Sequence, residues 1–387
     1  MPAVTVLVDP DPAGHHLQAV ANVARVAAET GPVVLLTLQG VKEWPSYEAY
    51  LGDLDFPLEV REVFDDRKMS SQAMIDAVAD LRTELARTGG TVSTVALMDA
   101  DQALKDWFWR GRRNRRRLFG PRVSGRVVLM LTRYPARARL TDPWLYKLKL
   151  PKALLTALAL VTGAAQRVVG FAGRDDLSAG ALVKRLRDPD VCEAHSRDRV
   201  ALRERHGLPV DRRIVGVFGV ISERRNVPLI WESMQAAGVD ADLLLAGAQD
   251  DDVRAWVEAT AAANPGRVHI FDAFLPNQLI DELVAASDVA PIALTNNGPS
   301  GIMGKAIAAG VPVVTAGSVV RAAEVKAAGC GVAAELTPAS LGAAIKQVLA
   351  SEGTWESRIP PATPEEFARN LLGVDADGRV SSTPFRA

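Results

Sequence analysis

The chain is poor in cysteine, has no long apolar run and carries no excess of charge of either sign. Only two of its 387 residues are cysteines, Cys192 and Cys330, which lie far apart and lack metal-ligand spacing. This pattern excludes a disulfide scaffold and a structural zinc site, and it fits a reducing cytoplasm. No run of about 18 apolar residues occurs, and the N-terminus has neither a basic region nor a long apolar stretch. We therefore expect no transmembrane helix and no signal peptide.

Positive and negative charges nearly cancel over the whole chain. The formal net charge is −1, with 24% charged and 48% hydrophobic residues. Nothing global therefore indicates a nucleic-acid-binding protein. The apolar fraction is large enough for two cores, and the length suggests two domains of ordinary size.

Strand-like and helix-like segments alternate from end to end, which predicts βαβ units and parallel sheets covered on both faces. The alternation lapses over residues 185–209, where polar residues and the turn Asp188-Pro189-Asp190 predict a linker. The expected strands are 4–8, 33–38, 58–64, 92–98, 127–132, 167–171, 214–218, 243–246, 268–270, 289–294 and 311–315. The expected helices are 17–29, 70–87, 144–162, 227–237, 251–263, 277–286, 341–349 and 364–372.

This pattern predicts an N-terminal Rossmann-like domain over residues 1–195 and a C-terminal one over residues 196–352. A tail over residues 353–387 could pack back on the first domain. Ligands of open α/β sheets bind at the carboxyl ends of the strands, so two facing domains would place the site in the cleft between them.

The most informative motif runs from Asn296 to Thr315. A loop rich in glycine, proline and serine leads into a helix of small residues, a glycine and a buried strand. A glycine-rich loop that opens a helix presents backbone N–H groups beside the positive end of the helix dipole, which suits a phosphate. Plain packing of a helix on a strand would use the same pattern.

A second candidate site follows the expected strand 214–218. There Gly219 leads into a short loop with Arg224 and Arg225, just before a helix. An arginine at such a place can bind a diphosphate with two hydrogen bonds. The alternative is a solvated surface arginine.

The end of the first strand carries Gly14, His15 and His16. Glycine allows a tight turn and close approach of the backbone to a ligand. Either histidine could bind phosphate, contact a sugar hydroxyl or act as a base. Either could equally cap a helix or be merely exposed.

Asp99, Asp101 and Arg133 follow two further strands of the first domain and could shape an acceptor pocket. Asp101 could equally cap the helix that begins there. The remaining histidines have no partners that suggest metal or triad chemistry, so we interpret them as structural. They are His195, His206 and His269.

The segment from Lys105 to Lys152 holds fifteen lysines and arginines against two acidic residues, Asp106 and Asp142. Its centre interleaves Trp and Phe with Arg. Such a segment can lie at an anionic membrane surface, bind nucleic acid, or attract an anionic lipid-linked acceptor. A solvated helix face is the simplest role, but fifteen to two exceeds what that role requires. We favour peripheral membrane contact over nucleic acid because the whole chain is nearly neutral.

Together these motifs resemble the GT-B glycosyltransferases, in particular the retaining family 4 enzymes, which use nucleotide-sugar donors. The resemblance covers nearly the whole chain and is strongest over residues 212–334. Its specificity lies in the ordered series of motifs, and Gly14-His15-His16 resembles the glycine loop after the family's first strand. The series is Phe218-Gly219, Arg225-Asn226, Leu244 to Gly247, Phe274-Leu275-Pro276, Ala285 to Asp288 and Ala306 to Val314.

Three positions depart from the family pattern. Asn297 and Lys305 stand where the family has two glutamates, the first near the donor sugar and the second at the ribose. A lysine cannot accept hydrogen bonds from a ribose diol, although it could pair with a phosphate. Val220 replaces a family arginine, for which Arg224 could substitute. Ribose contacts could therefore come from elsewhere, the donor could be unusual, or the chain could be inverting or without activity.

The resemblance implies an α/β protein of GT-B architecture, two Rossmann-like domains facing a central cleft. It implies transfer of a hexose from a nucleotide-diphosphate sugar to a glycan, a lipid-linked or a natural-product acceptor. The reaction would be retaining and would use neither metal nor cofactor, because the Asp-x-Asp spacings at Asp9 and Asp99 lie in the expected acceptor domain. The alternatives are a GT-B-type nucleotide-sugar epimerase and a non-catalytic nucleotide-sugar-binding or scaffold protein.

The resemblance also implies the site residues. The catalytic residues would be His15, Arg225 and Lys305, and the acceptor would contact His15, His16, Asp99, Asp101 and Arg133. The donor would contact Gly14, Gly219, Arg224, Arg225, Asn297, Gly298, Ser300, Gly301, Ile302, Met303 and Lys305.

Overall fold

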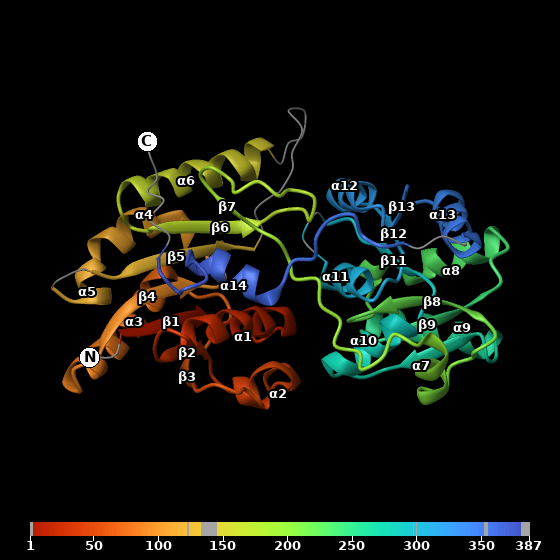
Figure 1. Cartoon of the computed structure of the whole chain (residues 1–387), viewed down its shortest axis with the longest axis horizontal. Coiled ribbons are helices and arrows are strands. Elements are labelled where there is room, and N and C mark those ends of the chain that lie inside the picture. Colours follow the sequence, from red (N-terminus) through yellow and green to blue (C-terminus); the bar gives the residue numbers. More distant parts are fainter. Residues whose placement is uncertain are drawn as a thin grey trace. The chain divides into compact units, whose positions relative to one another are not determined.

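The computed structural model describes residues 3–121, 124–132, 145–296, 298, 300–351 and 355–380. The chain forms two compact units, which are labelled by element in Figure 1. Unit 1 consists of Met1–Ala172, Asp176–Arg187 and Pro364–Ala387, and unit 2 of Gly173–Asp175 and Asp188–Thr363.

Unit 1 is built on a seven-stranded sheet in the order β3-β2-β1-β4-β5-β6-β7. All its pairings are parallel, and its strands are nearly continuous apolar runs because both faces are covered. The strand order reverses beside β1, which places the topological switch point between β1 and β4. The strands are β1 (Ala3–Asp9), β2 (Val33–Leu38), β3 (Leu58–Phe64), β4 (Thr91–Leu97), β5 (Arg126–Leu131), β6 (Arg167–Phe171) and β7 (Lys184–Leu186).

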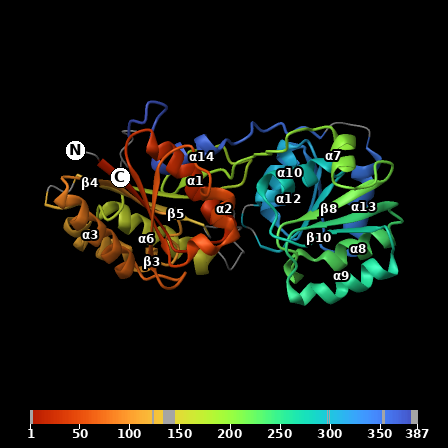
Figure 2. The same ribbon diagram turned by 90° about the horizontal axis from the view of Figure 1, so that it is seen from below.

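Helices cover both faces of this sheet (Figures 1 and 2). One core is shared with α3 (Ser71–Arg87), α4 (Leu104–Arg113), α5 (Arg115–Phe119) and α6 (Leu150–Val161). The other is shared with α1 (Gly14–Ala28), α2 (Pro45–Leu51) and α14 (Pro364–Leu372). Two short turns, Val41–Glu43 and the π-helical Leu145–Lys149, precede α2 and α6.

Unit 2 has two three-stranded parallel sheets, in the orders β10-β9-β8 and β11-β12-β13. A parallel bridge between Val215 and Val289 joins them, so that β8 and β11 are neighbours. The strands are β8 (Arg213–Phe218), β9 (Ala241–Ala246), β10 (Val268–Phe271), β11 (Ala290–Ala293), β12 (Val313–Ala316) and β13 (Gly331–Ala334).

The helices of unit 2 also pack on two sides. One core includes α7 (Arg199–Arg205), α10 (Asn277–Ala286), α11 (Gly301–Ala308) and α12 (Val319–Ala328). The other includes α8 (Val227–Ala236), α9 (Asp251–Ala263) and α13 (Pro338–Ala350). The 3-10 turn Glu223–Arg225 precedes α8.

The predicted α/β class is confirmed, but the expected linker over residues 185–209 carries regular structure. It contains the end of β7 and the whole of α7. The units divide between Arg187 and Asp188, whereas the expected boundary is at residue 195, and Asp188 and Asp190 bind Arg174, which also belongs to unit 2. The last helix, α14, belongs to unit 1 and buries its apolar side there.

Candidate functional site

The glycine-rich loop does open a helix. Ser300 caps α11, its Oγ accepting a hydrogen bond from the Met303 N–H at 3.3 Å. The backbone N–H groups of Gly301 and Ile302 find no acceptor within the described part of the chain. They are therefore available to an anion at the positive end of the helix. Met303 is fully buried in the core, and Asn297 lies outside the described residues.

A buried arginine that the sequence did not indicate holds the loop before α11. Arg321 of α12 is fully buried, and its Nη2 donates to the carbonyls of Leu294 and Asn296, both at 2.6 Å. Its Nη1 donates to the Gly298 carbonyl at 3.0 Å. Its Nε has no partner among the residues that the structure describes. Burial lowers the pKa of Arg321 to about 10.

Arg174 holds the same loop from another segment of unit 2. It is 3% exposed, and its Nη2 lies 3.3 Å from the Ser300 carbonyl that it contacts. The guanidinium is neutralised by Asp190, with Nε to Oδ1 at 2.6 Å, and by Glu324, with Nη1 to Oε2 at 3.5 Å. Arg174 is thus a structural group that fixes the start of α11.

Arg225 has no such neutralisation. It forms no ion pair with a carboxylate of the described residues, and its Nε donates only to the Val220 carbonyl at 3.2 Å. Burial, with smaller contributions from the charges of Arg224 and Arg321, lowers its pKa to about 10. The guanidinium of Arg225 is partly buried and is repelled by the charge of Arg321, so a bound anion would stabilise it.

Gly219 makes room for this arginine. Its φ is +80°, a left-handed conformation that favours glycine, and a Cβ there would lie 2.6 Å from Arg225 Nη2. Asn226 follows with φ 52°, and its Nδ2 donates to the Ala293 carbonyl at 2.7 Å. The turn is therefore fastened to the end of β11. Arg224 itself is exposed.

Lys305 has a different partner from the phosphate that the sequence predicted. Its Nζ lies 2.7 Å from Asp281 Oδ1, and Asp281 is fully buried on α10. The other carboxylate oxygen of Asp281 accepts a hydrogen bond from the Glu193 N–H at 2.7 Å. Because the lysine charge is already neutralised, the position of the second family glutamate is occupied by a buried ion pair.

In unit 1, His16 is held between carboxylates at the end of β1. It is 8% exposed, and its Nδ1 lies 3.0 Å from Asp9 Oδ2 while Nε2 lies 3.8 Å from Asp11 Oδ2. Burial alone would lower its pKa, but the carboxylates of Asp9 and Asp11 outweigh this and raise the pKa to about 9. His16 is therefore protonated at neutral pH. His15 is exposed, and its ring lies 4.5 Å from that of His16 between centroids.

The ends of β4 and β5 bring further polar groups together. Thr132 Oγ1 lies 2.8 Å from Asp101 Oδ2 and 3.3 Å from Asp99 Oδ1, and Lys152 forms an ion pair with Asp101. Burial raises the pKa of Asp99, with the charge of Asp101 as the next cause. Asp101 does not cap α4, which begins at Leu104. Arg133 lies outside the described residues.

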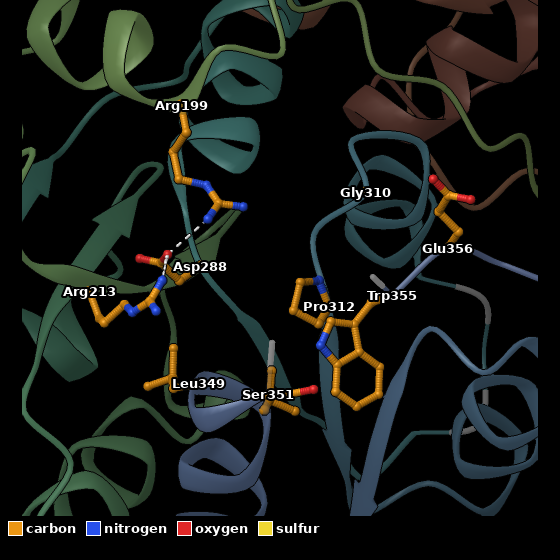
Figure 3. Close-up of a pocket in the computed structure, with 10 residues that line it drawn as sticks. Arg199, Arg213, Asp288, Gly310, Pro312, Leu349, Ser351, Trp355 and Glu356 are labelled. Atoms are coloured by element: carbon orange, nitrogen blue, oxygen red, sulfur yellow. Dashed lines mark hydrogen bonds and ion pairs between the residues drawn. The ribbon is translucent and has the colours of Figure 1, made fainter. Parts of the chain in front are cut away.

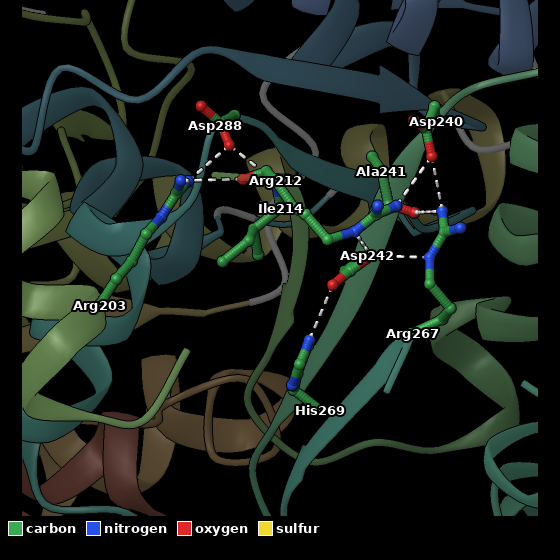
Figure 4. Close-up of polar contacts among 9 residues, drawn as sticks. All are labelled: Arg203, Arg212, Ile214, Asp240, Ala241, Asp242, Arg267, His269 and Asp288. Carbon is green, nitrogen blue, oxygen red and sulfur yellow. Dashed lines mark hydrogen bonds and ion pairs between the residues drawn. The ribbon is translucent and has the colours of Figure 1, made fainter. Parts of the chain in front are cut away.

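The three histidines interpreted as structural each bind a carboxylate. His195 Nδ1 and His206 Nε2 lie 2.6 and 2.7 Å from Glu282. His269 Nε2 lies 3.0 Å from Asp242, which also binds two arginines (Figure 4). No group of three or more possible metal-binding side chains occurs within the described residues.

Unit 2 also has a hollow of about 280 Å³ at the amino-terminal ends of its strands (Figure 3). Arg199 and Arg213 line one side, and Pro312 and Trp355 the other. Both arginines bind Asp288, at 2.9 and 3.1 Å. The hollow lies at the opposite edge of the sheet from the loop before α11, so it is not part of the candidate donor site.

The arginine-rich segment 105–152 forms most of α4, then α5, β5, the π-helical turn and the start of α6. Residues 122–123 and 133–144 of this segment lie outside the described residues. None of the helices in the described part of the chain has the length and apolarity needed to cross a membrane.

Comparisons with known proteins place this geometry in context. No family model matches the chain. A 2-deoxystreptamine glucosyltransferase of Streptomyces kanamyceticus is 33% identical over 169 residues, which is 42% of this chain and 40% of that enzyme. The match thus spans less than half the length of this relative.

Among solved structures, HepE of Anabaena with UDP matches at a TM-score of 0.61 and 15% identity, over 96% of this chain and 94% of that one. The glycosyltransferase WaaG of lipopolysaccharide biosynthesis matches at a TM-score of 0.54 and 15% identity, over 95% of this chain and 94% of that one. Sucrose-phosphate synthase of Thermosynechococcus elongatus matches at a TM-score of 0.58 and 14% identity, over 95% of this chain and 94% of that one. Because these matches run through both units, the resemblance is confirmed at the level of architecture: the chain has the GT-B fold of these glycosyltransferases.

Proposed function

We propose that the chain is a glycosyltransferase that moves a hexose from a nucleotide-diphosphate sugar to an acceptor. Three findings support the proposal: the GT-B fold, the identity to a glucosyltransferase, and the HepE structures, which hold UDP and UDP-glucose. The geometry adds a place where a diphosphate would be stabilised.

The observation that carries the proposal is the guanidinium of Arg225 without a neutralising carboxylate, together with the N–H groups at the start of α11. Arg225 lacks a carboxylate partner among the described residues, and the N–H groups of Gly301 and Ile302 have no acceptor there. When the bond between the sugar and the diphosphate breaks, negative charge develops on the leaving diphosphate. Fixed cations and N–H dipoles stabilise that charge without reorganisation.

The proposed roles of the individual residues follow from their partners. Arg225 contacts the diphosphate, and Arg224 and Gly298 lie on the loops around it. Lys305 fixes α11 on α10 through Asp281 and is a positioning residue. His16, protonated at neutral pH, does not act as the base. We favour a retaining, metal-independent reaction, which requires no protein nucleophile or base.

On the acceptor side, we propose His15 and Asp99 as contacts, with Arg133 as a further candidate. His16 and Asp101 hold the ends of the strands in place. The acceptor is a glycan, a lipid-linked sugar or a natural product. Since the partial relative acts on 2-deoxystreptamine, that aminocyclitol is the first acceptor to try.

The test is a transfer assay with UDP-glucose as donor and 2-deoxystreptamine among a panel of acceptors. We expect UDP release that depends on the acceptor, continues in EDTA, and yields an α-linked product by NMR. The exposed Arg87 provides a control variant, Arg87→Ala, with unchanged turnover. Nucleotide binding without turnover across a broad panel of donors and acceptors would instead indicate a binding protein, and a sugar epimer without transfer would indicate an epimerase.

A further inference from the structure

An apolar stripe on α6 is open to solvent. Leu150, Leu154 and Val161 are 50%, 62% and 72% exposed. Their spacings of four and seven residues place them on one face of the helix. The opposite face is fixed to unit 1, where Lys152 and Ala159 are buried. A helix that is apolar on both faces normally has both covered.

A group of arginines borders the end of this stripe. Arg112, Arg113 and Arg116 are exposed, and they line a hollow of about 640 Å³ together with Thr162 and Gly163 at the end of α6. The three form no ion pair with an acidic side chain of the residues placed in the structure. The exposed cations are thus free to meet an external anion.

Several hydrogen bonds join the arginine-rich helices to the C-terminal end of α6 and the residues that follow it. Arg115 Nη1 donates to the Gly163 carbonyl at 3.0 Å, and Thr162 Oγ1 donates to the Phe108 carbonyl at 2.9 Å. Val161, the most exposed member of the stripe, directly precedes Thr162. The stripe and the arginine-lined hollow therefore form one continuous surface.

The charged side chains of this surface are almost all positive. Residues 104–121 and 145–166 contain a single acidic residue, Asp106, and this carboxylate is bound by Arg110 and by the hydroxyl of Ser71. Exposed aliphatic side chains beside unpaired arginines match the interface of an anionic bilayer, where the chains enter the acyl boundary and the guanidiniums meet phosphates. The exposed side chains of the stripe are aliphatic, which favours an acyl boundary over stacked bases, and the exposed Trp109 and Tyr146 suit the headgroup level of a bilayer. A second copy would bring two arginine groups close together.

We propose that the exposed face of α6 and the arginines of α4 and α5 form a docking surface for an anionic lipid bilayer. The proposal is independent of the sugar-transfer reaction, since it concerns a surface on unit 1 that contains none of the candidate donor residues. Binding is peripheral and depends on both parts of the surface.

The test is flotation of the full chain with vesicles of phosphatidylcholine alone or with about 30% phosphatidylglycerol. We expect binding to the anionic vesicles, little to the neutral ones, and loss of binding between about 0.1 and 0.5 M salt. Leu154→Glu, and the double change Arg112→Ser with Arg113→Ser, should each weaken binding about tenfold or more.

Val200→Glu is the control, because Val200 is an aliphatic side chain of α7 in unit 2 with 51% exposure and is therefore not part of this surface on unit 1. It should bind as wild type does, and thermal melting should show that all variants fold. Equal binding to neutral and anionic vesicles, or no effect of Leu154→Glu, would overturn the proposal. So would a dimer in light scattering that Leu154→Glu converts to monomers, because the stripe would then be a contact between copies.

Discussion

At the scale of single residues, the balance of charge around Arg225 decides what the donor site can bind. Removing this side chain takes away a charge that the described protein groups do not neutralise. Arg225→Ala should therefore weaken UDP binding about 10- to 100-fold, the range expected for charge-assisted hydrogen bonds. Stability should stay the same or rise, because a desolvated, unpaired cation is lost.

Titration calorimetry with UDP and a thermal melt check this prediction. Arg225→Lys is an intermediate control, because lysine keeps the positive charge but cannot form two parallel hydrogen bonds. Its affinity for UDP should lie between those of the wild type and Arg225→Ala. Wild-type affinity in the alanine variant would remove Arg225 from the site.

The Lys305–Asp281 pair should affect folding more than ligand binding. Lys305→Met leaves a fully buried carboxylate unpaired, which should lower the free energy of unfolding by about 3 kcal/mol. Adding Asp281→Leu should recover much of the loss, because no buried charge remains. Urea unfolding of the four chains of this double-mutant cycle measures the coupling.

If Lys305→Met strongly lowered turnover without lowering the free energy of unfolding, Lys305 would instead be a residue that contacts the ligand.

The sequence indicated Arg225 and the start of α11 because their signals are local: a glycine, an arginine and a helix start within a few residues. Arg321 gave no signal, since it contacts Leu294 and Asn296 across 27 and 25 residues of chain. Lys305 was assigned to a phosphate because its partner, Asp281, is on another helix. Contacts between elements, rather than motifs, decide these roles.

At the scale of elements, α14 shows which segments a periodic pattern can predict. Its bounds match the expected helix 364–372, because the buried Phe367, Leu371 and Leu372 follow a helical period. Some missed elements are short or rich in polar residues, whereas α12 was missed although its ten residues, VVRAAEVKAA, are mostly apolar. β7 has three residues, and α7 has the sequence RVALRER, in which little apolar periodicity is visible.

The same helix yields a prediction for stability. Leu371 is fully buried between α14 and the core that α1 shares, so Leu371→Ala should destabilise unit 1 by about 3 kcal/mol. Leu177→Ala, at an exposed leucine, serves as the control and should change stability little. Urea unfolding measures both. Equal stability of the two variants would show that α14 does not complete this core.

At the scale of the whole molecule, alternation of strands and helices predicted two α/β units, but not where they divide. The chain enters unit 2 briefly at Gly173–Asp175, returns for β7, and enters again at Asp188. Arg174, in the first of these two segments of unit 2, binds Asp188 and Asp190 at the start of the second segment. A polar segment that crosses between units is indistinguishable in sequence from a linker, so the boundary was expected too late.

The stability of the molecule should fall in alkaline solution because of His16. Its pKa is about 9 in the folded chain and about 6.5 when unfolded, so the proton stabilises the fold. That contribution, about 3 kcal/mol, is complete below pH 6.5 and disappears as the pH rises through 9. The carboxylates that raise the pKa of His16 are those of Asp9 and Asp11, with a smaller effect of Asp99.

Urea unfolding between pH 6 and 10 should therefore show a steeper decline of the free energy of unfolding in wild type and in the control His15→Gln than in His16→Gln. Parallel profiles for all three chains would mean that His16 is not protonated in the folded state.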